Sequence, residues 1–118
     1  MVYYHGTKKV NKEKIEKEGF LASYGRFGDG VYFSSSLDEA KVFGSEICRV
    51  SVPEDKVMKI YYPDLINIYP DLSIEEEEGV PDLRNYVLSK GYLAVAIRYI
   101  SGETELCVYV PNIINIIG

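Results

Sequence analysis

Short runs of apolar and aromatic residues, bounded by glycine, proline or serine, predict that much of the chain forms β-strands. The Ser101-Gly102 turn predicts that the runs on either side of it form a hairpin. The predicted strands are Val2–His5, Val31–Ser34, Glu46–Pro53, Lys56–Tyr62, Tyr92–Ile100, Thr104–Pro111 and Asn112–Ile117.

Three segments carry the start and stop signals of helices instead. The first has Asn11 as its N-cap and Gly19 at its C-terminal stop. The second begins with the capping box Ser36–Glu39 and ends at Gly44. The third spans Val80–Gly91, with a proline in its first turn and a glycine at its stop. Strands and helices together predict an α+β fold with many short strands and about three helices.

The length of 118 residues, 47% of them hydrophobic, allows one compact domain with its own core. Pro63–Gly79 shows no regular pattern, but no repeat, linker or change in composition divides the sequence. We therefore expect a single domain over residues 1–118.

The formal net charge of −5 and the pI near 4.9 argue against a nucleic-acid partner, because proteins that bind nucleic acids usually have a basic face. Cys48 and Cys107 are far apart and have no histidine neighbours, so we expect free thiols, no metal site and a reducing, cytoplasmic context. We also expect no membrane association, because the chain has neither a basic-then-apolar leader nor an apolar run near 18 residues.

His5 is the only histidine, and it ends a predicted strand just before Gly6. It can be a hydrogen-bonded structural histidine. It can also be functional, because a following glycine lets a flat amide such as nicotinamide approach the backbone.

Tyr32 follows a loop that contains Gly25, Gly28 and Gly30, and Phe43 lies eleven residues further on. A lone tyrosine on a strand is usually a core residue. Here a strand that turns directly into a helix can bring the two rings face to face across a slot, with the glycines keeping bulk away from its mouth. In such a sandwich, each ring would stabilise a bound planar heterocycle by about 1–3 kcal/mol.

Glu105 starts the strand in "ETELCVYV", where Glu105, Cys107 and Tyr109 share one face and the residues between them share the other. An exposed edge glutamate is the ordinary reading. A carboxylate next to C1 of a sugar would instead stabilise an oxocarbenium-like transition state.

Together the segments "YHGT", "FGDGVYFS" and "ELCVY" resemble the His-Tyr-Glu signature of ADP-ribosyltransferases of the diphtheria-toxin and poly(ADP-ribose) polymerase type. In that family a His-Gly-Ser/Thr strand comes first, a strand of the form F-G-x-G-[IV]-Y-F second, and a glutamate on a late strand last. The three segments occur here in that order and span most of the chain, from Tyr4 to Tyr109. The resemblance implies an ADP-ribosyltransferase-like fold, with the short strands in two packed sheets.

The resemblance also implies roles for individual residues towards NAD, which is the substrate of that family; no metal is implied. His5 would bond and orient a ribose, the Gly6 backbone would hold the nicotinamide carboxamide, and Thr7 would meet the adenosine ribose. Tyr32 and Phe43 would sandwich the nicotinamide.

The implied role of Glu105 is to hold the nicotinamide ribose and to stabilise the cation as nicotinamide leaves.

Two positions depart from the family pattern. Ala40 stands where the polymerase-type enzymes have a serine for the carboxamide, and Ser34 is a candidate replacement. Glu103 creates an E-x-E spacing that is similar to arginine-modifying toxins, in which the first glutamate handles the acceptor; it can equally be a solvated hairpin residue.

The sequence thus predicts a mono-ADP-ribosyltransferase that releases nicotinamide and modifies a macromolecule, for which a basic protein is the expected acceptor. Its size suits a small bacterial or phage effector or toxin. An RNA 2′-phosphotransferase shares the general fold, but it needs basic side chains around phosphates. A catalytically silent domain that binds a protein partner is the third possibility.

Overall fold

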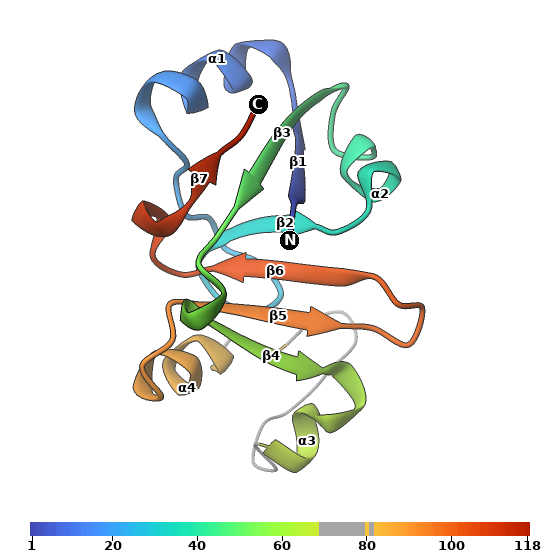
Figure 1. Cartoon of the computed structure of the whole chain (residues 1–118), viewed down its shortest axis with the longest axis vertical. Helices are drawn as coiled ribbons and strands as arrows, with labels where there is room; N and C mark the ends of the chain where they lie inside the picture. The colour runs from blue at the N-terminus through green and yellow to red at the C-terminus, as the bar shows by residue number, and fades with distance from the viewer. Residues whose placement is uncertain (69–79, 81) are drawn as a thin grey trace.

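The structure, a computed structural model, describes residues 1–68, 80 and 82–118. It is an α+β fold built on one mixed sheet of seven strands in the order β4-β5-β6-β2-β1-β3-β7 (Figure 1). Only the pair β4 and β5 is parallel; each of the other neighbouring pairs is antiparallel. The strands are β1 Tyr3–Thr7, β2 Val31–Ser34, β3 Glu46–Ser51, β4 Val57–Tyr61, β5 Ala94–Arg98, β6 Thr104–Val108 and β7 Asn115–Ile116.

The expectation of two packed sheets is wrong, because the strands form one continuous, curled sheet. The curl lies between β1 and β2, which share the single register pair Tyr4 with Ser34, whereas β1 pairs with β3 over five residues. In Figure 1, β1 and β3 accordingly run at a steep angle to β2, β6, β5 and β4. The sequence pattern predicts strands but not which edges pair, so it could not separate a split sheet from a bent one.

Helices are placed mostly as expected, with α1 at Lys9–Glu18, α2 at Leu37–Lys41 and α4 at Leu83–Ser89. Asn11 is not the N-cap of α1, because the chain leaves β1 and enters the helix at once, with Lys8 in the capping position. The N-cap of α2 is confirmed, since the backbone N–H of Glu39 donates to Ser36 Oγ at 3.3 Å. The second bond of a capping box, from the Ser36 N–H to the Glu39 side chain, is replaced by a bond from Ser36 N to Ser34 Oγ at 3.0 Å.

The short helix α3, Leu65–Ile68, was missed, because four residues are too few for a hydrophobic period to show. It follows a 3₁₀ turn at Tyr62–Asp64. Part of the segment Pro63–Gly79, for which no regular structure was predicted, lies outside the described residues.

The two faces of the sheet bury separate clusters of side chains, and β6 contributes to both of them. Leu106 and Val108 join Phe33 in the first cluster, whereas Cys107 and Tyr109 pack in the second. The predicted alternation along this strand is therefore confirmed. So is the hairpin between β5 and β6, which Gly102 closes with a φ of 93° and an N–H that donates to Tyr99 O at 2.9 Å.

Cys48 and Cys107 are both free and buried, on opposite faces of the sheet. Burial raises the pKa of the Cys107 thiol to about 12. A thiol in such surroundings stays protonated near neutral pH and behaves as a small apolar side chain.

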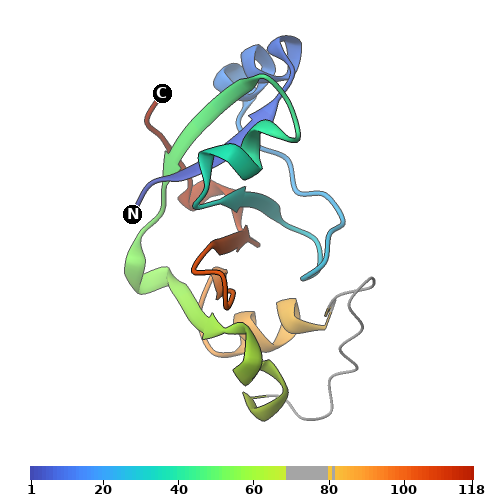
Figure 2. The same cartoon turned by 90° about the vertical axis from the view of Figure 1, so that its right-hand side faces the viewer.

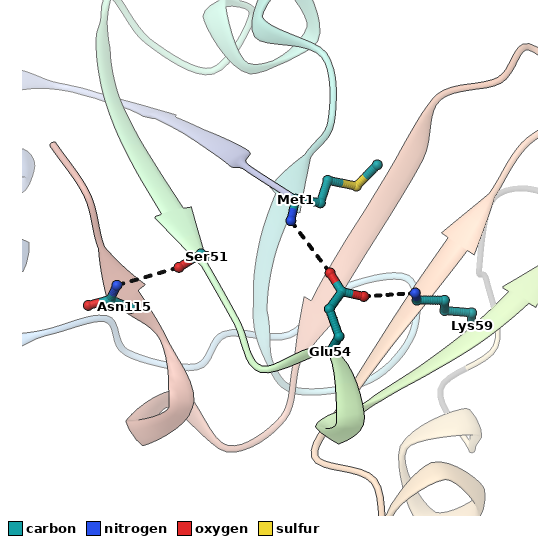
Figure 3. A network of polar contacts seen from close by, with 5 residues as sticks. All are labelled: Met1, Ser51, Glu54, Lys59 and Asn115. Atoms are coloured by element: carbon teal, nitrogen blue, oxygen red, sulfur yellow. Dashed lines mark hydrogen bonds and ion pairs between the residues drawn. The ribbon is translucent and has the colours of Figure 1, made fainter.

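A surface network links the start of the chain to the turn before β4 (Figure 3). The Glu54 carboxylate pairs with Lys59 Nζ at 2.7 Å and with the Met1 amino group at 3.5 Å. The Lys59 hydrogen bond lowers the pKa of Glu54. Since Glu54 is half-exposed, solvent screens these pairs and their contribution to stability is small.

We expect Glu54→Gln to lower the free energy of unfolding by at most about 1 kcal/mol at pH 7. A carboxyl whose pKa is lowered on folding stabilises the fold above its unfolded pKa of about 4.3, and this contribution disappears as pH falls through the folded value. The difference from the parent protein should therefore shrink steadily as the pH is lowered below that unfolded value. Urea unfolding at pH 7 and at a series of acidic pH values measures it, with Glu13→Gln on α1 as the charge-matched control; a difference that grows on acidification would contradict the assignment.

Candidate functional site

A cavity of about 400 Å³ opens between β1, β2, α2 and the β5–β6 hairpin, and it contains the three residues of the predicted signature. Its volume lies within the range of small-molecule sites. Figure 2 shows the molecule from the side on which α2, β2 and the β5–β6 hairpin lie. The lining residues are Tyr4, His5, Gly6, Arg26, Tyr32, Phe33, Ser34, Glu39, Ala40, Phe43, Tyr99, Glu103, Thr104 and Glu105.

His5 lines the cavity, and one of its ring nitrogens holds the imidazole in place. Its Nδ1 lies 2.9 Å from the carbonyl oxygen of Tyr32. Because a carbonyl can only accept, Nδ1 carries the hydrogen, and in the neutral ring Nε2 is then an acceptor. The rings of Phe20 and Phe33 contact the imidazole edge-on, with centroids 5.2 and 5.6 Å away. His5 is thus a packed, hydrogen-bonded residue that also lines the cavity.

Tyr32 is held at both sides of its hydroxyl oxygen. The hydroxyl donates to Gly28 O at 2.5 Å and accepts from Phe27 N at 2.9 Å. Burial raises the pKa of Tyr32 well above its usual value, so the ring remains a neutral phenol. A ring fixed in this way can form a rigid wall of the cavity.

The loop glycines do more than keep bulk away from the cavity. A β-carbon on Gly25 would overlap the ring of Tyr32, and one on Gly30 would strike Cys107 and the backbone of Val108. These two glycines therefore let the loop pack against Tyr32 and β6.

The resemblance implies that both Gly6 and Thr7 contact NAD, but of these two residues the cavity lining includes Gly6 alone. Gly6 lines it, but a β-carbon there would collide with the carbonyl group of Ala40, so this glycine is also needed for α2 to pack against β1. Thr7 is buried and is not among the lining residues.

Phe43 follows α2 and lines the cavity, although 76% of its surface is exposed. It is therefore no core residue, and a ligand in the cavity could cover its ring. Ser34 also lines the cavity; its Oγ accepts from Ser36 N at 3.0 Å and can still donate its own hydrogen. Ala40 lines the same wall with its small side chain almost fully buried.

Glu105 lies in the middle of the sheet, half-buried, with Ile97 of β5 on one side and Ser34 of β2 on the other. Glu103 lies two residues earlier, exposed on the hairpin, and its carbonyl accepts from Tyr99 N at 2.9 Å. Both glutamates line the cavity.

Several lining residues were missed, and two of them, Tyr99 and Arg26, are linked to Glu105 by hydrogen bonds. Tyr99 Oη donates to Glu105 Oε1 at 2.8 Å, and Arg26 Nη1 lies 3.4 Å from Tyr99 Oη. The predicted hairpin held the signal for Tyr99, because counting back from its turn makes Tyr99 a diagonal neighbour of Glu105. Arg26 gave no such signal, since it lies in a loop and reaches Tyr99 only through the tertiary fold.

Within the described part of the chain, no group of three or more His, Cys, Asp or Glu side chains could hold a metal ion. None of the helices in that part is long and apolar enough to span a membrane.

No protein-family model matches the chain, and neither does any curated protein. Among solved structures, the crystal structure of an anti-CRISPR protein is similar to it, with a TM-score of 0.50. The two are 17% identical, and the match covers 99% of this chain and 95% of the other. At that identity the likeness extends to the fold and not to the chemistry of the site.

We expect Gly25→Ala to destabilise the protein by about 1–3 kcal/mol, because the new methyl group overlaps a ring that its two hydrogen bonds hold in place. Chemical denaturation measures the loss. Gly118→Ala is the control, since its β-carbon would meet only Arg49 Nη2 at an ordinary 3.8 Å. Equal stability of the two variants would show that Tyr32 is not packed on Gly25.

Proposed function

We propose that the protein is an NAD-dependent mono-ADP-ribosyltransferase. The observation that carries the proposal is that His5, Tyr32 and Glu105, which are far apart in the sequence, line one cavity together with the exposed ring of Phe43. A cavity of this size suits nicotinamide with its ribose. Its lining combines a histidine, two aromatic rings and a carboxylate, which are groups that suit this substrate.

In the proposed reaction, the bond between the nicotinamide nitrogen and C1 of the ribose breaks, and its electron pair leaves with nicotinamide. Glu105 stabilises the positive charge that develops on the ribose. A nucleophile of the acceptor then bonds to C1 and loses its proton to a base. Glu103 is our candidate base, because it lines the same cavity and is exposed to an incoming macromolecule.

The proposed acceptor is a basic protein. The net charge of −5 favours such a partner, and Glu39 and Glu103 add two exposed carboxylates where it would dock. The biological setting that we propose is that of a small bacterial or phage effector.

The charge of the lining residues favours this function over RNA 2′-phosphotransfer. Among the described residues that line the cavity, Arg26 is the one arginine or lysine, and two tyrosines already engage its guanidinium. Convergent basic side chains for RNA phosphates are therefore missing from the described lining.

Glu105→Gln should keep the fold and the affinity for NAD but lower kcat by about 10²–10³, because the change removes a charge that acts mainly in the transition state. Release of nicotinamide, followed by chromatography over a range of NAD concentrations, separates kcat from KM. Glu103→Gln is the matched variant: it should retain hydrolysis of NAD but lose transfer to the acceptor. If Glu103→Gln abolished hydrolysis and Glu105→Gln did not, the roles would be assigned to the wrong glutamates.

Phe43→Ala should weaken binding of a nicotinamide analogue by about 1–3 kcal/mol if the ring stacks on the ligand. Its stability should change by less than about 0.5 kcal/mol, because the side chain is on the surface. Calorimetric titration and thermal unfolding of the same samples give the two numbers. Val42→Ala, at the equally exposed neighbouring position, is the control. Unchanged affinity in Phe43→Ala would remove Phe43 from the sandwich.

A further inference from the structure

A hydrogen bond inside the cavity joins Glu105 to a residue that the family signature does not contain. Tyr99 Oη lies 2.8 Å from Glu105 Oε1, and both side chains line the cavity. The register places Ile97 opposite Glu105, so Tyr99, just after β5, is the diagonal neighbour of Glu105 on the same face. The contact therefore follows from the pairing of two sheet strands and not from the path of a loop.

The direction of the hydrogen bonds around Tyr99 is determined by its partners. Arg26 can only donate, and its Nη1 lies 3.4 Å from Tyr99 Oη. The Tyr99 oxygen therefore accepts from Arg26 and gives its own hydrogen to the carboxylate of Glu105. Burial, followed by the charge of Glu105, raises the pKa of Tyr99 well above its usual value, so the phenol keeps the hydrogen that it donates.

Arg26 is itself held in place by aromatic rings. Its guanidinium carbon lies 5.5 Å from the ring centroid of Tyr62 and 6.0 Å from that of Tyr99, and Nη2 donates to Tyr62 Oη at 3.3 Å. The two tyrosine rings pack on each other with centroids 5.2 Å apart. A cation that contacts two rings and two hydroxyls has few other positions open to it.

We infer that Tyr99 is a positioning residue for Glu105, and that Arg26 holds Tyr99 in the orientation in which it donates. The inference rests on the proposed function of Glu105. With Oε1 engaged by Tyr99, the carboxylate cannot rotate freely, and its second oxygen is the one that meets the ribose. A carboxylate that is already oriented does not have to be ordered as the positive charge forms.

Arg26 could instead bind the phosphates of NAD directly, since it lines the cavity and its Nε is buried without a hydrogen-bond partner. The two roles separate kinetically. Loss of a phosphate contact weakens binding of the substrate and raises KM. Loss of an orienting residue lowers kcat and leaves KM nearly unchanged.

The experiment measures nicotinamide release at varied NAD concentrations for the parent protein, Tyr99→Phe, Arg26→Met and the control Tyr24→Phe. Tyr24 is 75% exposed and is not among the residues that line the cavity. Tyr99→Phe removes only a hydroxyl, so we expect kcat to fall by about 10- to 100-fold, as for a hydrogen bond to a charged group, with KM within about twofold. Arg26→Met should show the same pattern, and Tyr24→Phe should match the parent.

Tyrosine labelled with ¹³C at Cζ provides a readout that does not depend on activity. The Tyr99 resonance, assigned by its loss in Tyr99→Phe, should shift in Glu105→Gln and stay in place in Glu103→Gln. If Tyr99→Phe does not fold, the resonance that Glu105→Gln shifts is assigned by incorporating the label at position 99 alone.

Each outcome either supports or overturns the inference. An active parent with a Tyr99→Phe variant of equal kcat, or a Tyr99 resonance that Glu105→Gln does not shift, overturns the inference and leaves the proposed function standing. A raised KM with unchanged kcat in Arg26→Met overturns the role of Arg26 and assigns it to the substrate. A folded parent that releases no nicotinamide from NAD overturns the proposed function, and the inference falls with it.

Discussion

The pairing of β2 with β6 is the contact on which the rest of the candidate site depends. Four consecutive register pairs run from Val31 with Val108 to Ser34 with Glu105. Beyond them, Ser35 N donates to Thr104 O at 2.9 Å, and Thr104 N donates to Ser35 Oγ at 2.8 Å. This pairing fastens the C-terminal hairpin, which carries the glutamates, to the N-terminal half, which carries His5 and Tyr32. The side chains that stabilise it are almost fully buried, so an apolar contact positions a polar site.

The cavity exists because the sheet bends next to that pairing. β1 meets β2 at one register pair, whereas its other edge pairs with β3 along its whole length. At the point of divergence, the His5 side chain hydrogen-bonds the carbonyl of Tyr32, so the imidazole connects the two strands where their register pairing ends. Gly6 lets α2 close over the same bend, because its lack of a side chain admits the carbonyl of Ala40.

The tyrosines explain how a glycine-rich loop is held in place beside this cavity. Phe27 is fully buried, and its backbone is held from both sides: its N–H donates to Tyr32 Oη, and its carbonyl accepts from Tyr109 Oη at 2.8 Å. Each tyrosine places its ring against the second apolar cluster and its hydroxyl against the loop. Tyr99 does the same with Glu105 as its partner. The aromatic richness of the composition thus serves to tie loops and functional groups to the core.

The sequence by itself determined the elements whose signals are local. Strand β2 was predicted with its observed ends, Ser36 caps α2 as predicted, and the β5–β6 hairpin turns where Ser101-Gly102 predicted. These features depend on hydrogen bonds and backbone angles within a few residues, which neighbouring side chains decide. Only the tertiary structure decided that the strands form one bent sheet, that Thr7 lies outside the cavity lining, and that Arg26 and Tyr99 stand beside Glu105. Those outcomes depend on which strand edges pair and on how a loop crosses the sheet, and such contacts between distant residues leave no periodic trace in a single sequence.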